Sequence, residues 1–227
     1  MTSSTKGIPA ELKPLTGLHV LVDDSPRWKL NPVELAREAC RGGAQVIQLR
    51  CKHQTDAQIL EWGIALRKLT REAGTALVLN DRFDLALLCE ADGVHLGQDD
   101  FPPDAIPSKV RERLQVGRST HDLDQVREAA GQGFDYIAFG PLFGTTSKQT
   151  PYEERGLEAL TQACATASPT PIIAIGGIEG NQLASIQEAG ARGFAVIGAV
   201  AGATDPCAAT ESLSNAWSRV SERFPRR

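Results

Sequence analysis

Short apolar runs alternate with amphipathic segments along almost the whole chain, and no other feature restricts the available folds as strongly. Eight runs are candidate strands, at residues 18–24, 44–50, 76–80, 93–96, 114–119, 135–140, 171–177 and 193–198. Segments with helical periodicity lie between and after them, at residues 32–42, 55–73, 82–90, 122–132, 153–167, 180–189 and 206–222. Strands joined by helical crossovers predict a parallel sheet.

The number of these units predicts a closed (β/α)8 barrel. Eight strand–crossover units within about 210 residues fit the size of that fold. The crossover at residues 99–113 is rich in proline and ends in a short charged segment. An open doubly wound sheet is the alternative, but no G-x-G-x-x-G motif follows the first strand. We expect one α/β domain, a TIM barrel spanning residues 17–227, after a flexible extension of residues 1–16.

Helix boundaries carry residues with known capping preferences. Asn31 precedes a proline at the first helical position, and Asp122 precedes an apolar-periodic run. Gly74, Gly133 and Gly190 stand where helices should end.

The charge balance excludes some classes of partner. A net charge of −4 lacks the basic character of general nucleic-acid or anionic-membrane binders. No run of about 18 apolar residues is present, so we expect no membrane span. The N-terminus lacks an apolar signal core, and the five scattered cysteines show no metal-binding spacing. We expect a cytoplasmic protein with reduced thiols, and a homo-oligomer is compatible with these features.

Polar residues gather where the candidate strands end. In the second strand, Gln48, Arg50 and Lys52 share one face because alternate residues point the same way, whereas Cys51 points to the other. The other strand ends carry Asn80, Asp81, His95, Gln98, Asp99, Asp100, Ser119, Thr120, His121, Thr145, Thr146, Ser147, Lys148, Gly176, Gly177 and Gly198. Active sites of (β/α)8 barrels lie at this end of the strands.

These residue types suit phosphate binding assisted by a divalent metal. Arginine and lysine bind phosphate oxygens, and neighbouring aspartates are hard oxygen ligands for Mg²⁺. Glycines after the seventh and eighth strands leave backbone N–H groups open to a second phosphate. We infer a metal-assisted anion site across strands two to six and a metal-free site across strands seven and eight.

Structural roles are the alternatives for single residues. Arg50 and Lys52 could pair with Asp81 or Asp100 for stability alone, and Asp81 could cap the helix at 82–90. Asp99 fits a solvated loop. His95 fits a hydrogen-bonded place inside the barrel, and His121 suits a structural or a functional role equally.

Six motifs in order resemble the thiamine-phosphate synthase (thiamine-phosphate pyrophosphorylase) family over residues 17–203. They are QLRCK, ND, DGVHLGQDD, GRSTH, GPLFGTTSK and AIGGI. The resemblance implies a (β/α)8 transferase of thiamine biosynthesis. Such enzymes join 4-amino-2-methyl-5-(diphosphooxymethyl)pyrimidine to a thiazole phosphate and release pyrophosphate.

The resemblance also implies roles for residues at matching positions. Gln48, Leu49, Arg50, Cys51, Lys52 and Asn80 would bind the pyrimidine diphosphate, and Asp81 and Asp100 would hold Mg²⁺. Ser119 and Lys148 would contact the pyrophosphate. Thr145, Thr146, Ser147, Gly177, Ile197 and Gly198 would hold the thiazole phosphate. Arg50, Lys52, Ser119 and Lys148 are the implied catalytic residues.

The implied reaction is dissociative, so preorganised cations and metal that stabilise the leaving pyrophosphate lower its barrier. Three positions depart from the family pattern. Gly144 stands where proline is usual, Ser147 where threonine is common, and Gly198 where serine is common. The loss of a hydroxyl at Gly198 predicts weaker thiazole-phosphate binding.

Two other functions compete with this interpretation. The related thiazole tautomerase, also a (β/α)8 barrel, would use His121 as acid and base. A non-catalytic phosphate-binding barrel would bind ligands without turnover. Neither function needs the pair Asp81 and Asp100 opposite several cations, so the synthase is favoured.

Overall fold

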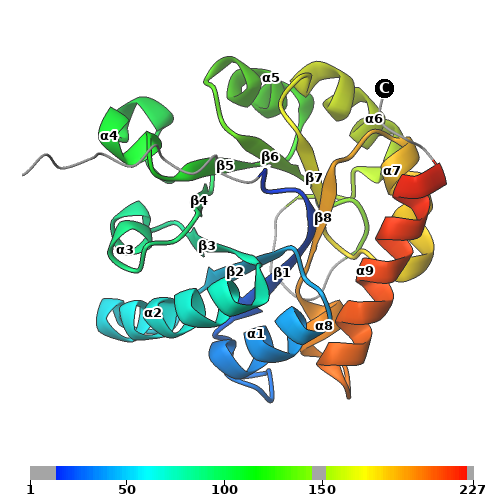
Figure 1. Ribbon diagram of the computed structural model, residues 1–227. Coiled ribbons are helices and arrows are strands. Elements are labelled where there is room, and N and C mark those ends of the chain that lie inside the picture. Colours follow the sequence, from blue (N-terminus) through cyan, green and yellow to red (C-terminus); the bar gives the residue numbers. More distant parts are fainter. Residues whose placement is uncertain (1–13, 145–151, 224–227) are drawn as a thin grey trace, which may run out of the picture.

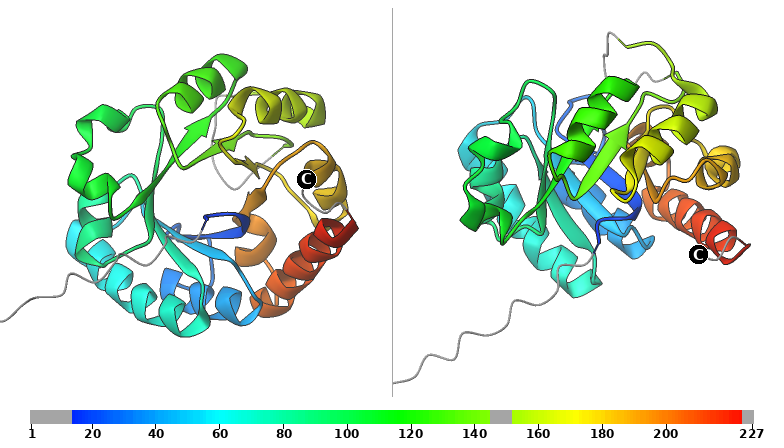
Figure 2. Two further views of the ribbon diagram at one scale, coloured as in Figure 1. Left: turned by 45° about the horizontal axis from the view of Figure 1, so that its top comes forward. Right: turned by 90° about the horizontal axis from the view of Figure 1, so that it is seen from above.

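A computed structural model describes residues 14–144 and 152–223 as eight parallel strands inside a ring of helices (Figures 1 and 2). The strands are β1 (Gly17–Asp23), β2 (Val46–Arg50), β3 (Ala76–Asn80), β4 (Gly93–Leu96), β5 (Gln115–Thr120), β6 (Tyr136–Phe139), β7 (Ile172–Ile175) and β8 (Gly193–Val196). The helices are α1 (Pro32–Arg41), α2 (Asp56–Ala73), α3 (Phe83–Leu88), α4 (Ser108–Arg111), α5 (Leu123–Gly131), α6 (Gly156–Ala167), α7 (Leu183–Glu188), α8 (Gly198–Ala201) and α9 (Pro206–Arg223), with 3-10 turns η1 (Pro103–Ala105) and η2 (Gly180–Gln182).

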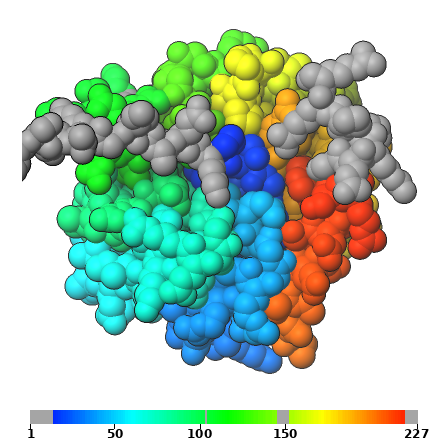
Figure 3. Space-filling view, viewed as in Figure 1, coloured from blue at the N-terminus to red at the C-terminus, as the bar shows by residue number. Residues whose placement is uncertain are grey.

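The strands follow one another around a closed barrel in chain order, and β1 pairs with β8 to complete it. Gly17 and Gly193 are register partners at this closure. The predicted (β/α)8 barrel is therefore confirmed, and the open doubly wound sheet is excluded. A space-filling view shows the first described residues, in dark blue, with later segments around them in chain order from cyan to red (Figure 3).

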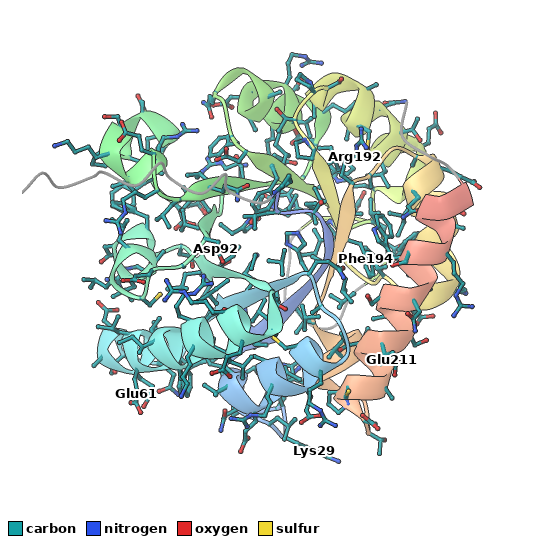
Figure 4. All side chains as sticks on the ribbon, in the orientation of Figure 1. Lys29, Glu61, Asp92, Arg192, Phe194 and Glu211 are labelled. Atoms are coloured by element: carbon teal, nitrogen blue, oxygen red, sulfur yellow. The ribbon has the colours of Figure 1, made fainter. Side chains whose placement is uncertain are left out.

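Side chains along each strand point alternately outward and into the barrel, and this alternation gives two separate apolar regions. In β1, Leu18, Val20 and Val22 belong to the large core between the barrel and its helices, whereas Leu21 belongs to a smaller cluster inside the barrel. The outer core continues to the last helix, where Phe194 of β8 points toward α9 and its ring lies 5.0 Å from that of Trp217 (Figure 4).

Predicted helix boundaries match the structure closely. The Asn31 side chain accepts hydrogen bonds from the Val33 and Glu34 backbone and forms a capping box, and Asp122 caps α5. Gly74, the C-cap of α2, has a φ of 69°, in the left-handed region that favours glycine. Among the described residues, no helix is long and apolar enough to cross a membrane.

Several segments differ from expectation. The sixth, seventh and eighth strands end one or two residues early, and Gly176 and Gly177 turn the chain away after β7 with φ values of 100° and 64°. The proline-rich crossover holds η1 and the one-turn helix α4, and α8 was not predicted. Of the expected extension, residues 1–13 lie outside the described residues, while Leu15 is buried inside the barrel.

Candidate active site

A pocket opens at the carboxyl-terminal ends of the strands and continues into the barrel. Each of the eight strands contributes to its wall, as expected for the active site of this fold. Seven predicted site residues line it: Gln48, Arg50, Asn80, Ser119, Gly177, Ile197 and Gly198. Three histidines and one tyrosine add polar groups to the lining, namely His19, His95, His121 and Tyr136.

Two aspartates at the end of β1 contact the segment at the end of β2 that carries Arg50 and Lys52. Asp23 is buried and forms an ion pair with Arg50. The Asp24 carboxylate accepts hydrogen bonds from the backbone N–H groups of Lys52 and His53, at 2.9 and 2.8 Å. For Arg50, the structural alternative of an ion pair with Asp81 or Asp100 was therefore wrong, because its partner is Asp23. Asp23 and Asp24 were missed, although polar residues at a strand end were the signal used for the other strands.

Lys52 follows β2 and pairs with Asp81, which follows β3; neither residue is among those that line the pocket. Asp81 has a φ of 67°, in the left-handed region that non-glycine residues seldom adopt. The alternative in which Asp81 caps the helix was wrong, since Arg82 occupies the N-cap of α3 and its side chain makes no capping hydrogen bond. The Asp81 carboxylate is instead paired with Lys52.

The carboxylates of Asp81 and Asp100 lie close enough to affect each other's ionisation. Burial opposes ionisation of Asp81, but the hydrogen bond and charge of Lys52 outweigh it and hold the pKa of Asp81 below its usual value. Burial, together with the charge of Asp81, raises the pKa of Asp100. Two adjacent carboxylates with opposite shifts are a common feature of functional sites.

The turn that carries Asp100 is fixed by β5. The Gly97 backbone N–H donates to Asp100 Oδ2 at 2.6 Å. The Arg118 guanidinium donates to the carbonyl oxygens of Gly97 and Gln98, at 2.6 and 3.1 Å. Gln98 Nε2 in turn donates to the Ser119 carbonyl oxygen. Asp99, as expected, is exposed.

The two histidines at the strand ends have different environments. His95 is buried and hydrogen-bonded inside the barrel, as predicted, with Ser119 Oγ 2.8 Å from Nε2 and the Tyr136 hydroxyl 3.0 Å from Nδ1. His121 Nδ1 lies 2.7 Å from the carbonyl oxygen of Gly140, and its ring stacks on Tyr152.

The far wall of the pocket is formed by the turns after β7 and β8. A Cβ on Gly177 would lie 2.3 Å from the Gly144 carbonyl oxygen, so only glycine permits this close approach of two backbones. Ile197 precedes α8, which Gly198 begins. This wall offers backbone groups and apolar side chains in place of the charges found opposite.

Some predicted site residues lie elsewhere. The side chains of Leu49 and Cys51 pack in the outer core, so only their backbone groups could face a ligand. Burial, with help from Asp24 and Asp23, raises the pKa of the Cys51 thiol to about 12. The predicted residues Thr145, Thr146, Ser147 and Lys148 lie outside the described residues.

Asp81 and Asp100 could hold a divalent cation. Within residues 14–144 and 152–223, no group of three or more His, Cys, Asp or Glu side chains is placed to bind a metal. Mg²⁺ is commonly held by one or two carboxylates together with substrate phosphates and water. The donor set therefore fits a cation whose remaining ligands come from a phosphorylated substrate.

A pocket that carries polar side chains at the carboxyl-terminal ends of the strands of a closed barrel is the usual active site of a (β/α)8-barrel enzyme, and this chain has that arrangement. Comparison with known proteins then gives its family. The sequence model of the family described as thiamine monophosphate synthase matches residues 18–200. The chain belongs to the thiamine monophosphate synthase family, a family of transferases.

Individual relatives agree with this assignment over most of their length. The thiamine-phosphate synthase of Salinibacter ruber is 44% identical over 209 residues, which cover 92% of each chain. That of Anaeromyxobacter dehalogenans is 44% identical over 89% of this chain and 88% of its own. The solved thiamine phosphate pyrophosphorylase from Pyrococcus furiosus is 36% identical, with a TM-score of 0.82 over 90% of this chain and 96% of its own.

Proposed function

We propose that this enzyme is a thiamine-phosphate synthase acting on two phosphorylated substrates. It would join 4-amino-2-methyl-5-(diphosphooxymethyl)pyrimidine to 4-methyl-5-(2-phosphoethyl)thiazole or its carboxylate. The products would be thiamine phosphate and pyrophosphate. The observation that carries the proposal is the cluster of Lys52, Asp81 and Asp100 just after β2, β3 and β4, together with Arg50 at the end of β2 in the pocket wall.

The cationic wall suits the diphosphate group. Arg50 and Asn80 line the pocket, and Lys52 follows two residues after Arg50. Guanidinium and ammonium groups already held in place stabilise the charge that develops on a departing pyrophosphate, and they need no reorganisation during the reaction. Gln48, buried on the inner face of β2, would bind the pyrimidine end of the same substrate.

Asp81 and Asp100 would hold Mg²⁺ together with diphosphate oxygens. When bound, this ion would neutralise part of the diphosphate charge and make pyrophosphate a better leaving group. The depressed pKa of Asp81 keeps one carboxylate ionised for this role. Lys148 would assist from the segment that follows β6.

The opposite wall suits the thiazole phosphate. Gly177, Ile197 and Gly198 line it, and backbone N–H groups at such turns bind phosphate without a metal. Thr145, Thr146 and Ser147 would complete this site. The two substrates would then meet between the charged wall and the glycine-rich wall.

The proposed chemistry is a dissociative substitution. The C–O bond to the diphosphate breaks first, and the thiazole nitrogen captures the resulting pyrimidine methylene cation. No side-chain nucleophile takes part, so the protein contributes orientation, charge stabilisation and exclusion of water. The aliphatic lining from Leu21, Ile173 and Ile175 favours the exclusion of water.

Thiazole tautomerisation is the second candidate function. It is favoured by His121, whose ring lines the pocket and is held by Gly140 and Tyr152. That reaction needs one proton donor and acceptor and no diphosphate site. The cations and paired carboxylates across β2–β4 have no purpose in it, so we favour the synthase.

Pyrophosphate release tests the proposal directly. The purified protein would be incubated with both substrates and Mg²⁺, with each substrate alone, and with both substrates plus EDTA. We expect full release of pyrophosphate, with an equal yield of thiamine phosphate, only when both substrates and metal are present. Restoration of release by excess Mg²⁺ controls for damage by EDTA. Absence of release under all conditions contradicts the proposal, and thiazole carboxylate would then be tested as a substrate.

Two further expectations belong to the same proposal. We propose a cytoplasmic location, where the substrates of a biosynthetic transferase would be available. We also propose small-molecule substrates as the enzyme's ligands, without nucleic acid or membrane.

A further inference from the structure

A buried line of hydrogen bonds connects the barrel interior with the floor of the pocket. The Tyr136 hydroxyl lies 3.0 Å from His95 Nδ1, and His95 Nε2 lies 2.8 Å from Ser119 Oγ. Tyr136 is 1% exposed and His95 6% exposed, whereas Ser119 is partly exposed in the pocket wall. One imidazole thus joins a buried phenol deep in the barrel to a more exposed hydroxyl that a ligand can reach.

The phenol fixes the direction of these hydrogen bonds. Burial raises the pKa of Tyr136, so its oxygen keeps its proton. Within the part of the chain that the structure describes, His95 Nδ1 is the one hydrogen-bond partner of this hydroxyl. A buried O–H without an acceptor is unfavourable, so Tyr136 donates and Nδ1 accepts.

An accepting Nδ1 determines the tautomer of His95. A neutral imidazole carries its proton on one nitrogen and accepts on the other. With Nδ1 as the acceptor, the proton is on Nε2, which then donates to Ser119 Oγ. The Ser119 hydroxyl proton then has no acceptor among residues 14–144 and 152–223 and can be donated into the pocket.

The barrel holds Tyr136 in this position from two sides. A Cβ on Gly117 of β5 would lie 2.0 Å from Tyr136 Cζ, so the absence of a side chain there makes room for the ring. The edge of the His19 ring contacts Tyr136, with 5.6 Å between centroids, and His19 Nε2 lies 3.3 Å from the carbonyl oxygen of Leu15. Tyr136 therefore has little freedom to redirect its hydroxyl.

We propose that Tyr136 and His95 are positioning residues that commit the Ser119 hydroxyl to donating a hydrogen bond to an anionic substrate oxygen. In the opposite arrangement Ser119 would donate to His95 and present only lone pairs to the anion. The identity of the anion rests on the proposed function, in which Ser119 contacts the diphosphate. A preorganised donor of this kind stabilises the leaving group most strongly as its charge develops.

The tautomer of His95 can be measured without any activity assay. The chain has four histidines, so nuclear magnetic resonance of protein labelled with ¹⁵N in the imidazole rings gives few signals. His95→Gln identifies the signals of His95. We expect proton–nitrogen correlations of the Nε2–H tautomer in the unmodified protein. The Nδ1–H tautomer would overturn the proposal.

Kinetics test whether Tyr136 acts through Ser119. In the pyrophosphate-release assay, Tyr136→Phe should lower kcat about tenfold and leave KM for the thiazole phosphate nearly unchanged, because a preorganised donor acts mainly in the transition state. The same substitution should have no further effect in a Ser119→Ala background, because the hydroxyl that it positions is gone. An equal fall in both backgrounds would indicate a purely structural role and overturn the proposal.

Thr75→Val is the matched control for loss of a buried hydroxyl. Thr75 Oγ1 donates to the Ala44 carbonyl oxygen at 3.0 Å, just before β3 at the end of the barrel remote from the pocket. We expect Thr75→Val to lower stability without lowering kcat. If the unmodified protein shows no synthase turnover, the proposed function fails, and the tautomer measurement still decides the direction of the hydrogen bonds.

Discussion

Lys52 and Asp81 form an ion pair between the ends of β2 and β3, and the pair relies on a left-handed aspartate. Aspartate tolerates this backbone region better than most residues do. Strain of this kind persists where the surrounding structure fixes the residue, often at functional sites. The carboxylate proposed as a metal ligand is therefore already held beside a cation proposed to bind the diphosphate.

Asp81→Asn should remove metal-dependent turnover while leaving the fold intact. Asparagine tolerates a positive φ and has nearly the same shape, but it loses the charge that attracts both Lys52 and Mg²⁺. We expect kcat to fall about 100-fold or more, because removal of one electrostatic contact to a transition state has an effect of this size in other enzymes. Pyrophosphate release across a Mg²⁺ titration is the measurement. Asp124→Asn on the exposed face of α5 is the matched control, and an unchanged Mg²⁺ response in Asp81→Asn would contradict the metal assignment.

Asp23→Asn should weaken use of the diphosphate substrate through Arg50. The buried Asp23 carboxylate orients the guanidinium, and without it Arg50 can adopt other rotamers. We expect kcat/KM for the pyrimidine diphosphate to fall about tenfold, since a misplaced charge loses part of its stabilisation of the leaving group. Glu38→Gln breaks an exposed ion pair with Arg41 and serves as the control. Equal kinetics for Asp23→Asn and Glu38→Gln would mean that the Asp23 contact is structural only.

Gly117→Ala adds only one methyl group but should destabilise the protein strongly. The new Cβ would lie 2.0 Å from Cζ of Tyr136, in a barrel that leaves the ring little room to move. Overpacking of this kind costs about 1–3 kcal/mol or more. Gly131→Ala is the control, since nothing lies within 4 Å of a Cβ there and its φ is ordinary. Urea unfolding should show a clear loss for Gly117→Ala and none for Gly131→Ala, and equal midpoints would refute the steric account.

His19→Gln should reduce the loss of stability in mild acid. Burial lowers the pKa of His19 from 6.5 to about 4. Below pH 6.5, His19 therefore becomes protonated in the unfolded chain but stays neutral in the folded protein. The contribution of His19 to the free energy of unfolding is lost as the pH falls toward 4. The shift corresponds to about 3 kcal/mol over that range.

Urea unfolding at pH 7 and at pH 4.5 measures this difference. Glutamine can still donate to the Leu15 carbonyl oxygen but does not titrate, so the variant should lose less stability than the unmodified protein between the two pH values. The other acidic and basic groups are the same in both proteins and cancel in the comparison. Parallel losses in both proteins would show that His19 does not resist protonation in the folded state.

Periodicity and strand-end polarity were sufficient to predict the barrel and part of the lining of its pocket. Strand parity correctly put Gln48 and Arg50 on the inner face of β2 and Cys51 on the outer face. These predictions succeed because both depend on local alternation, which a single strand already determines.

Contacts between strands were harder to predict. The partner of Arg50 is Asp23, a residue of the neighbouring strand, and its identity depends on the pairing register of β1 with β2. Tyr136 was missed because an aromatic residue in an apolar strand is typical of any core. The role of Tyr136 depends on Gly117 and His95, which belong to two other strands and lie beside it in the folded barrel. The left-handed backbone of Asp81 also has no counterpart in the sequence pattern.

Closure of the barrel by its first and last strands has a consequence for how the enzyme is made. The register of Gly17 with Gly193 joins positions from opposite ends of the chain, and such long-range pairing is slow to form. Every strand also contributes to the pocket. A nascent chain in which β8 has not yet been synthesised therefore has no complete substrate site. We expect catalytic competence to arise late in biosynthesis, after release of the C-terminal segments from the ribosome, and to be absent from truncated products.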